Sequence, residues 1–220
     1  MKIFLDTADR VALKKWAVTG IIDGVTTNPS NLSKEGGDPR QVLTDICALF
    51  PEGDISIEVV EKDPKAVYEQ ALAISKFAPN ITVKIPFVEN LLPVIDRLCR
   101  EGIAVNVTLI FSVLQALLVA KMGVSYISPF VGRWDDIDVD GIILIEQLMQ
   151  LKTNYDFESE ILVASIRNLT HWNKAALAGA DVATVGPALL EQLMHHPLTE
   201  RGLAGFDTDW KKLGNIKFIE

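Results

Sequence analysis

The stretch Ile81-Thr-Val-Lys-Ile-Pro86 alternates between two unlike faces. Ile81, Val83 and Ile85 form one face with aliphatic side chains, whereas Lys84 stands in the middle of the other. Alternation with a period of two predicts a β-strand. No acidic residue lies within four positions of Lys84, so burying its charge would be costly. Desolvation favours a neutral amine, which is a nucleophile toward carbonyl groups. Because strand lysines are usually solvated, the other strands must decide whether this face looks into a site.

The composition is that of a soluble globular protein with a large core. The chain has 220 residues, of which 49% are hydrophobic and 23% charged. A net charge of −8 opposes general nucleic-acid binding, which needs a basic surface. No apolar run reaches the roughly 18 residues of a membrane span, and Asp6 comes too early for a signal peptide. Cys47 and Cys99 form no CxxC pair, which is typical of reduced thiols in a cytoplasmic protein.

Short apolar runs alternate with longer amphipathic segments along the whole chain. We predict strands over residues 2–6, 24–28, 55–60, 81–86, 104–109, 126–131, 161–166 and 182–185. We predict helices over residues 9–18, 39–50, 64–77, 89–100, 112–122, 141–151, 168–178 and 187–194, and a further C-terminal helix over 198–213.

Eight strands, each followed by a helix, is the count of a (β/α)₈ TIM barrel. The chain is short for that fold, whose members typically have about 250 residues. The alternative is an open doubly wound sheet, which usually has a glycine-rich loop after its first strand. Here that turn is Asp6-Thr-Ala-Asp9, without glycine. We therefore predict one α/β domain over residues 1–220, a (β/α)₈ barrel with an additional C-terminal helix.

Polar residues recur on the strand face that carries Lys84. If Lys84 points into the barrel, the same alternation places polar groups inward near the carboxyl ends of most strands. Active sites of this fold lie at those ends, whereas an interior without a function is usually filled by branched aliphatic side chains. The inward polar residues are Asp6, Asn28, Glu58, Lys84, Asn106, Thr108, Ser128 and Ser165, with Phe130, Arg133 and Arg167 at or just beyond the strand ends.

Six sequence blocks resemble those of the transaldolase family, in order and across essentially the whole chain. They are Phe4-Leu-Asp-Thr-Ala8, Gly24-Val-Thr-Thr-Asn-Pro-Ser30, Val83-Lys-Ile-Pro86, Asn106-Val-Thr-Leu-Ile-Phe111, Ser128-Pro-Phe-Val-Gly-Arg133 and Ala164-Ser-Ile-Arg-Asn168. The short chain resembles the small subfamily, which also contains fructose-6-phosphate aldolases.

The resemblance implies class I aldol chemistry without a metal or another cofactor. Lys84 would form a Schiff base with the ketose carbonyl. Glu58 and Thr108 would hold a water molecule that moves protons, a role that suits a carboxylate beside a hydroxyl in a dry pocket. Asp6 would act as acid and base at the C4 hydroxyl of the substrate.

The same resemblance implies a set of substrate-binding residues. Asn28, Asn106 and Ser128 would bind sugar hydroxyls. Arg133 and Arg167, helped by Ser165, would clamp the sugar phosphate, because guanidinium groups match phosphate geometry.

Phe130 and Glu58 favour one activity within the family. Fructose-6-phosphate aldolases resemble this chain but carry tyrosine at the position of Phe130 and usually glutamine at that of Glu58. A phenyl ring cannot place water against the enamine, so the enamine would wait for an aldose acceptor. We therefore expect a transaldolase, which is a transferase.

The expected reaction converts sedoheptulose 7-phosphate and glyceraldehyde 3-phosphate to erythrose 4-phosphate and fructose 6-phosphate in the non-oxidative pentose phosphate pathway. One alternative is a fructose-6-phosphate aldolase that releases dihydroxyacetone. Another, of a different class, is a non-catalytic barrel that binds sugar phosphates. Sugar phosphates are the expected partners, without nucleic acid or membrane.

The C-terminal helix over residues 198–213 carries an apolar stripe at Leu203, Phe206 and Trp210. It could pack on its own barrel. The small subfamily uses such a helix against a neighbouring subunit, which would imply a homo-oligomer, a pentamer or decamer.

A run of aspartates at Asp135, Asp136, Asp138 and Asp140 lacks the glycine and the terminal glutamate of a calcium loop. We expect it to cap the helix that starts at Gly141 rather than bind a metal. We expect His171 to lie on the surface.

Overall fold

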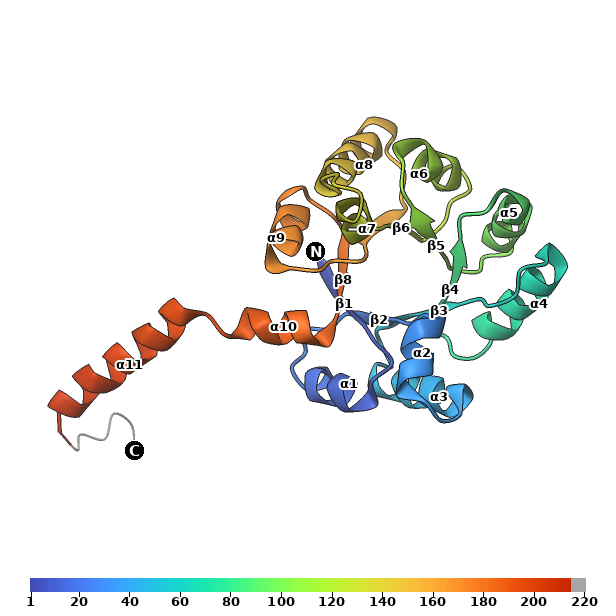
Figure 1. Cartoon of the computed structure of the whole chain (residues 1–220). Coiled ribbons are helices and arrows are strands. Elements are labelled where there is room, and N and C mark those ends of the chain that lie inside the picture. The colour runs from blue at the N-terminus through green and yellow to red at the C-terminus, as the bar shows by residue number, and fades with distance from the viewer. Residues whose placement is uncertain (215–220) are drawn as a thin grey trace. The chain divides into compact units, whose positions relative to one another are not determined.

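Eight parallel strands close into a barrel in the computed structural model, which describes residues 1–214 (Figure 1). Each strand pairs with its neighbour in the chain, and β8 pairs with β1. The strands are β1 Lys2–Asp6, β2 Gly24–Thr26, β3 Asp54–Glu58, β4 Ile81–Pro86, β5 Val105–Ile110, β6 Tyr126–Pro129, β7 Glu160–Val163 and β8 Val182–Val185. The predicted (β/α)₈ barrel is confirmed.

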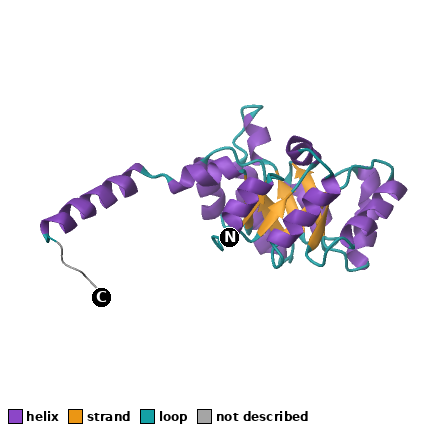
Figure 2. Ribbon diagram, turned by 90° about the horizontal axis from the view of Figure 1, so that it is seen from below, coloured by secondary structure: helices purple, strands orange, loops and turns teal. Residues whose placement is uncertain are grey.

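Within the unit Met1–Pro187, helices follow the strands and surround them, and further helices complete the described chain (Figure 2). They are α1 Arg10–Ala17, α2 Pro29–Glu35, α3 Pro39–Leu49, α4 Pro64–Ser75, α5 Leu92–Arg100 after the short η1 Glu89–Leu91, α6 Val113–Ala120, α7 Val131–Asp135, α8 Ile142–Tyr155, α9 Leu169–Leu177, α10 Pro187–Met194 and α11 Pro197–Lys212. The additional C-terminal helix, α11, is confirmed. None of the helices in the described part of the chain is long and apolar enough to cross a membrane.

The chain divides into two compact units, Met1–Pro187 with the barrel and a second one from Ala188 with α11. The predicted single domain over residues 1–220 stays a prediction, and its last residues, 215–220, lie outside the described part.

Two short helices, α2 and α7, were not among the predicted elements. α2 begins where strand 24–28 was expected to end, because Asn28 leaves the sheet and caps the helix. Its side chain accepts a hydrogen bond from the backbone N–H of Asn31 at 2.9 Å, and Pro29 occupies the first turn. As a result, β2 is shorter than predicted, and Asn28 serves as the N-cap of α2 rather than as part of the strand.

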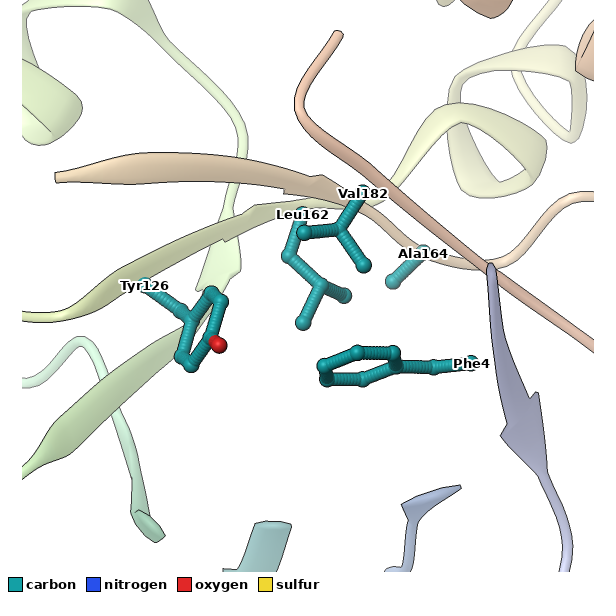
Figure 3. Packing of buried hydrophobic residues seen from close by; sticks show 5 residues of the cluster. All are labelled: Phe4, Tyr126, Leu162, Ala164 and Val182. Atoms are coloured by element: carbon teal, nitrogen blue, oxygen red, sulfur yellow. The ribbon is translucent and has the colours of Figure 1, made fainter. Parts of the chain in front are cut away.

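The strands divide their side chains between two environments. Val83, Ile85 and Val107 are fully buried, as expected for the face that packs on the helices. Inside the barrel, apolar side chains form one cluster, in which the rings of Phe4 and Tyr126 meet edge to face at 5.8 Å (Figure 3). Its members are Phe4, Tyr126, Leu162, Ala164 and Val182.

Polar side chains follow this cluster toward the carboxyl ends of the strands. Asp6, Ser128 and Thr184 each lie two positions after a member of the cluster on the same strand. Because alternate residues share a face, these polar groups form the next layer of the interior. The apolar layer thus closes the barrel below a polar mouth.

Candidate active site

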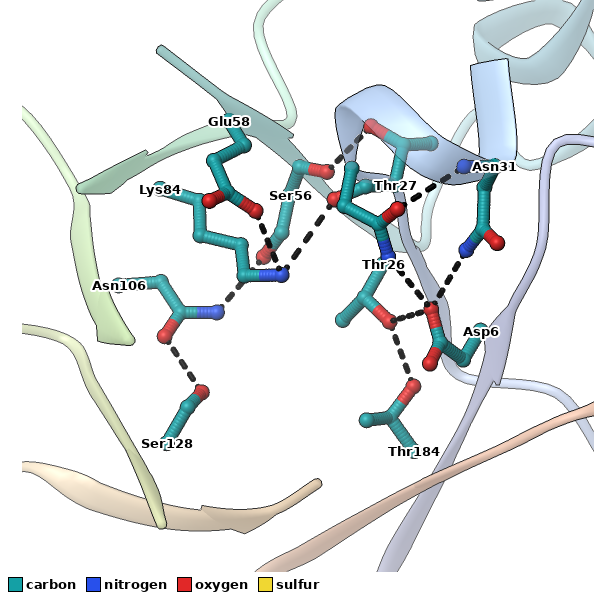
Figure 4. A network of polar contacts seen from close by, with 11 residues as sticks. Asp6, Thr26, Thr27, Asn31, Ser56, Glu58, Lys84, Asn106, Ser128 and Thr184 are labelled. Carbon is teal, nitrogen blue, oxygen red and sulfur yellow. Dashed lines mark hydrogen bonds and ion pairs between the residues drawn. The ribbon is translucent and has the colours of Figure 1, made fainter. Parts of the chain in front are cut away.

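Lys84 lies in this polar layer, with only 5% of its surface exposed. Its Nζ atom is 3.1 Å from Glu58 Oε2 (Figure 4), and the two residues are partners in the β3–β4 register. The amine also lies 3.5 Å from the carbonyl oxygen of Thr27. Strand register thus brings an acid to Lys84 that its neighbours along the chain do not supply.

A second group of polar residues surrounds Asn106, the register partner of Lys84 on β5. The Ser128 hydroxyl donates to Asn106 Oδ1 at 2.6 Å, and Asn106 Nδ2 donates to Ser56 Oγ at 3.2 Å. All three side chains are buried. These two hydrogen bonds define the orientation of the Asn106 amide beside the lysine.

Asp6 lies on the other side of Lys84, at the end of β1. Its Oδ1 atom accepts hydrogen bonds from Asn31 Nδ2 at 2.8 Å and, at 3.4 Å, from Thr26 Oγ1 and Asn28 Nδ2. Thr26 is in turn bonded to Thr184 at 2.6 Å. Burial raises the pKa of the Asp6 carboxyl above its ordinary value, while the charge of Lys84 and the donors Asn31 and Thr26 act in the opposite direction.

A cavity of about 360 Å³ opens above these residues. Its lining is formed by Asn28, Pro29, Ser30, Asn31, Glu58, Lys84, Thr108, Leu109, Phe130 and Arg133. Thr108 Oγ1 is buried and has no hydrogen-bond partner among the described residues. A buried hydroxyl without a partner is a place where a water molecule or a ligand can bind.

The predicted site residues divide into three groups. Six line the cavity: Asn28, Glu58, Lys84, Thr108, Phe130 and Arg133. Three belong to the polar networks beside Lys84: Asp6, Asn106 and Ser128. Ser165 and Arg167 are absent from this lining.

Arg133 and Arg167 differ in their surroundings. The Arg133 guanidinium lies 5.5 Å from the centre of the Phe130 ring and forms part of the cavity wall. Arg167 forms a two-pronged ion pair with Asp136, in which Nη2 and Oδ2 are 2.7 Å apart. The Arg167 guanidinium holds the pKa of the Asp136 carboxyl below its usual range.

Ser165 does not continue the alternation of β7. That strand ends at Val163, and the interior cluster includes Leu162 and, one residue past the strand end, Ala164. The backbone of Ser165 has a φ of 59°, and its carbonyl oxygen accepts a hydrogen bond from the Gly132 N–H at 3.0 Å. The predicted strand position of Ser165 was therefore wrong, because β7 ends at Val163 and Ser165 has a left-handed backbone conformation.

The acidic run that begins at the last residue of α7 pairs with side chains of α9 and of the chain before it. Asp140 accepts a hydrogen bond from the Ile142 N–H at 2.9 Å, which confirms the predicted cap, and it also pairs with Lys174. Asp135 lies 2.9 Å from His171 Nε2. The His171 side chain is 12% exposed and lines an open cavity, so it reaches the predicted surface only in part.

A larger and more open cavity of about 500 Å³ lies beside this acidic run and α9. Two of its acids, Asp135 and Asp140, already pair with His171 and Lys174, and no cluster in residues 1–214 could hold a metal ion. The cavity at Lys84 is therefore the better candidate site, because it combines a buried amine with a hydroxyl that lacks a partner.

Some residues of the site were not predicted as functional. Ser56 and Thr184 lie on inward strand positions, so alternation could have identified them. By the alternation that predicts Asn106 and Thr108 inward, Leu109 would face outward; it lines the cavity instead, because its φ of 59° interrupts β5 at a register shift. Asn31 could have been found only by recognising α2, where the first turn brings it near Asn28.

These features define a (β/α)₈ barrel with a lysine-centred polar cavity at the carboxyl ends of its strands. The sequence model of the family described as Transaldolase/Fructose-6-phosphate aldolase matches residues 3–217. The chain belongs to this family, which confirms the predicted resemblance.

Two relatives are similar to this chain over nearly their whole length. A probable transaldolase of Dehalococcoides mccartyi is 47% identical over 214 residues, which cover 97% of this chain and 99% of that protein. A probable transaldolase of Parvibaculum lavamentivorans is 49% identical over 215 residues, covering 97% and 98% of the two chains.

Among solved structures, a mandelate oxidase variant with a monooxide FMN adduct is similar, with a TM-score of 0.59 and 13% sequence identity. The match covers 84% of this chain and 63% of the oxidase. At this identity the likeness shows the barrel fold alone.

Proposed function

We propose that this protein is a transaldolase that transfers a dihydroxyacetone unit between sugar phosphates through a Schiff base on Lys84. The observation that carries the proposal is the buried Lys84 amine on a cavity wall, 3.1 Å from the Glu58 carboxylate. A carboxylate at this distance can take a proton from the amine and so free it for attack on a carbonyl. The relatives called probable transaldolase support the same activity.

The proposed reaction begins with attack of the Lys84 amine on the ketose carbonyl. The resulting carbinolamine loses its oxygen as water, with the proton delivered from Glu58 through a water molecule held against Thr108. The Thr108 hydroxyl, which has no hydrogen-bond partner within residues 1–214, supports such a water site. Loss of the carbinolamine oxygen as water leaves a protonated imine on Lys84, which withdraws electrons from the neighbouring carbon.

Cleavage of the C3–C4 bond follows. Asp6 takes the proton of the C4 hydroxyl, the C3–C4 electron pair moves to the imine, and an aldose phosphate leaves. An enamine of dihydroxyacetone remains on Lys84. A second aldose phosphate then reacts with the enamine in the reverse sequence, Asp6 returns its proton, and hydrolysis of the new imine releases the product ketose.

Substrate binding in this proposal divides between hydroxyl and phosphate groups. Asn28, Asn106 and Ser128 bind the hydroxyls of the sugar. The orientation that Ser128 and Ser56 give the Asn106 amide supports its part. At the phosphate end, Arg133, Arg167 and Ser165 bind the dianion, and Arg167 exchanges part of its pairing with Asp136 for the phosphate.

Phe130 and Glu58 favour transfer over simple cleavage. Phe130 lies at the cavity wall between Arg133 and Phe111, whose ring is 6.1 Å away. A phenyl ring there excludes water from the enamine without offering a hydroxyl that could protonate it. The expected substrates are sedoheptulose 7-phosphate and glyceraldehyde 3-phosphate, with erythrose 4-phosphate and fructose 6-phosphate as products, in the non-oxidative pentose phosphate pathway.

Trapping with borohydride tests the Schiff base. The protein is incubated with fructose 6-phosphate and borohydride, and the modified peptide is identified by mass spectrometry. We expect one reduced sugar adduct at Lys84 and none in Lys84→Ala, while Lys65→Ala, at an exposed lysine of α4, behaves as wild type. An adduct that persists without Lys84 contradicts the proposal.

The dependence on an acceptor distinguishes the two activities of the family. Fructose 6-phosphate is supplied with and without erythrose 4-phosphate, and the products are quantified. We expect turnover only with the acceptor. Rapid release of free dihydroxyacetone without it would instead identify an aldolase.

The proposal includes a cytoplasmic homo-oligomer, a pentamer or decamer. Its support is α11, where Leu203 and Phe206 are exposed on one face of the helix. Molar mass from light scattering tests it: Phe206→Asp should reduce the mass, whereas Thr208→Asp on a different face of the same helix should not. A wild type that remains monomeric at micromolar concentration rejects this part.

A further inference from the structure

Asn31 uses its backbone and its side chain for two different tasks. It lies in the first turn of α2, where its backbone N–H donates to Asn28 Oδ1 at 2.9 Å and completes the helix cap. The side chain takes no part in that cap. Its amide turns instead toward β1 and donates to Asp6 Oδ1 at 2.8 Å (Figure 4).

This amide is the closest donor to the Asp6 carboxylate. Thr26 Oγ1 and Asn28 Nδ2 reach the same oxygen only at 3.4 Å, which is long for a hydrogen bond. The other oxygen, Oδ2, accepts no hydrogen bond from residues 1–214. The three donors therefore hold one oxygen of the carboxylate and leave the other available to a substrate.

The helix that carries Asn31 is tied at its far end. Arg10 Nε donates to Glu35 at 2.7 Å, at the last residue of α2, and Arg10 Nη1 donates to Asp45 of α3 at 2.8 Å. With Asn28 capping one end and Glu35 paired at the other, α2 presents the Asn31 amide from a defined position. A donor on a fixed element loses less freedom when it binds than one on a mobile loop.

We infer that Asn31 is a positioning residue for the proposed acid and base Asp6: its amide directs one carboxylate oxygen toward α2 and leaves the other free to face the substrate. The inference rests on the proposed function and deepens it, because it assigns to α2 the orientation of the group that takes the C4 proton. The inference rests on the asymmetry of the hydrogen bonds to Asp6, because the one short donor, Asn31 Nδ2, binds Oδ1 and not Oδ2.

Electrostatics supports the same role. Burial raises the pKa of the Asp6 carboxyl, and the Asn31 hydrogen bond is among the interactions that lower it again. A base must be ionised to accept a proton, so loss of the donor makes the active form of Asp6 scarcer at mildly acidic pH.

The test compares three single variants in the acceptor-dependent assay with fructose 6-phosphate and erythrose 4-phosphate across a range of pH. Asn31→Leu removes the amide but keeps the backbone N–H that caps α2. Asn31→Asp keeps the shape and replaces the donor with a carboxylate. Asn154→Leu is the matched control, because it removes an exposed amide that pairs with Gln150 on α8, away from the cavity.

We expect the acidic limb of the kcat profile to move to higher pH in Asn31→Leu. At mildly acidic pH, kcat should fall about tenfold with a smaller change in KM, and the loss should shrink as pH rises. Asn154→Leu should match wild type. If Asn31→Leu does not fold, as judged by circular dichroism, the isosteric Asn31→Asp carries the test and should move the same limb upward.

A double mutant separates positioning from general support of the fold. In an Asp6→Asn background, adding Asn31→Leu should cause no further loss, because the group through which Asn31 acts is gone. An unmoved acidic limb in the folded variant, or an equal loss in both backgrounds, would overturn the inference.

Borohydride trapping of Asn31→Leu keeps the two proposals distinguishable. A variant that still traps sugar at Lys84 but shows an unmoved limb overturns the role of Asn31 alone. A wild type that neither traps sugar nor turns over substrate overturns the proposed function and this inference together.

Discussion

Asp6 illustrates at the scale of one residue how the proposed function costs stability. Its carboxyl is buried at the end of β1, and burial raises its pKa above the ordinary value of 3.8. Between the ordinary and the raised pKa, the folded protein binds more protons than the unfolded chain. Stability therefore falls as pH rises through this window, and the deficit persists at neutral pH.

We predict that Asp6→Asn is more stable than wild type at neutral pH by roughly 1 kcal/mol, because an amide carries no charge to desolvate. The advantage should disappear below the ordinary pKa of aspartate, where Asp6 is protonated in both states. Urea unfolding at neutral and acidic pH measures it. Turnover should fall at least about 100-fold with the loss of the proposed base.

Asp209→Asn on α11 is the control for a general effect of removing a carboxylate, since Asp209 is exposed and pairs with Lys212. If wild type exceeds Asp6→Asn in stability at neutral pH, the burial cost assigned to Asp6 is wrong.

At the scale of elements, α7 determines where two predicted site residues lie. Phe130 is its N-cap and Arg133 lies within it. Its first backbone N–H groups donate to the chain that follows the neighbouring strand β7, from Val131 to Ala164 and from Gly132 to Ser165. This close approach depends on Gly132, because a Cβ there would lie 2.3 Å from the Ser165 carbonyl oxygen.

We predict that Gly132→Ala forces α7 away from the chain after β7. The unfolding free energy should fall by about 2–3 kcal/mol, as for other overpacked sites. Because Arg133 moves with the helix, KM for the sugar phosphate should rise about tenfold. Gly205→Ala on α11, where a new methyl group meets nothing within 4 Å, is the matched control. Wild-type KM and stability in Gly132→Ala would contradict the assigned role of this contact.

At the scale of the whole barrel, the amino ends of the strands contribute to stability, whereas the carboxyl ends hold the candidate site. Near the amino ends, the Tyr126 hydroxyl donates to Asp54 and Lys2 pairs with Glu160 at 2.9 Å. Burial raises the pKa of the Tyr126 phenol above its ordinary value of 10.0, and the hydrogen bond to Asp54 raises it further by a smaller amount. The apolar cluster separates this network from the mouth that holds Lys84.

We predict that Tyr126→Phe lowers the unfolding free energy by about 1–3 kcal/mol, because Asp54 loses a donor. Its kcat should stay within about twofold of wild type, because the geometry of the site at the carboxyl ends of the strands does not depend on Tyr126 near their amino ends.

A phenol whose pKa is raised in the folded protein stabilises that protein at pH values below its ordinary pKa, and this contribution is lost as pH rises above that value. The stability gap between the two proteins should therefore narrow at alkaline pH, as measured by urea unfolding. A large loss of kcat would show that the two ends are coupled.

The sequence by itself determined the barrel and most of the candidate residues. Alternation on the strand around Lys84, repeated on the other strands, predicted which faces are apolar and which are polar, because side-chain direction along a strand is a local property. The boundaries of β1, β4 and β8 follow from the same periodicity. The family blocks added the expected chemistry.

Only the tertiary structure decided how these residues meet. Glu58 reaches Lys84 through strand register, and Asn31 reaches Asp6 through a helix that periodicity did not predict. The positive φ of Leu109 and Ser165 turns both residues out of the expected alternation. These outcomes depend on pairing and backbone geometry between distant segments, which the order of residues along a single strand does not contain.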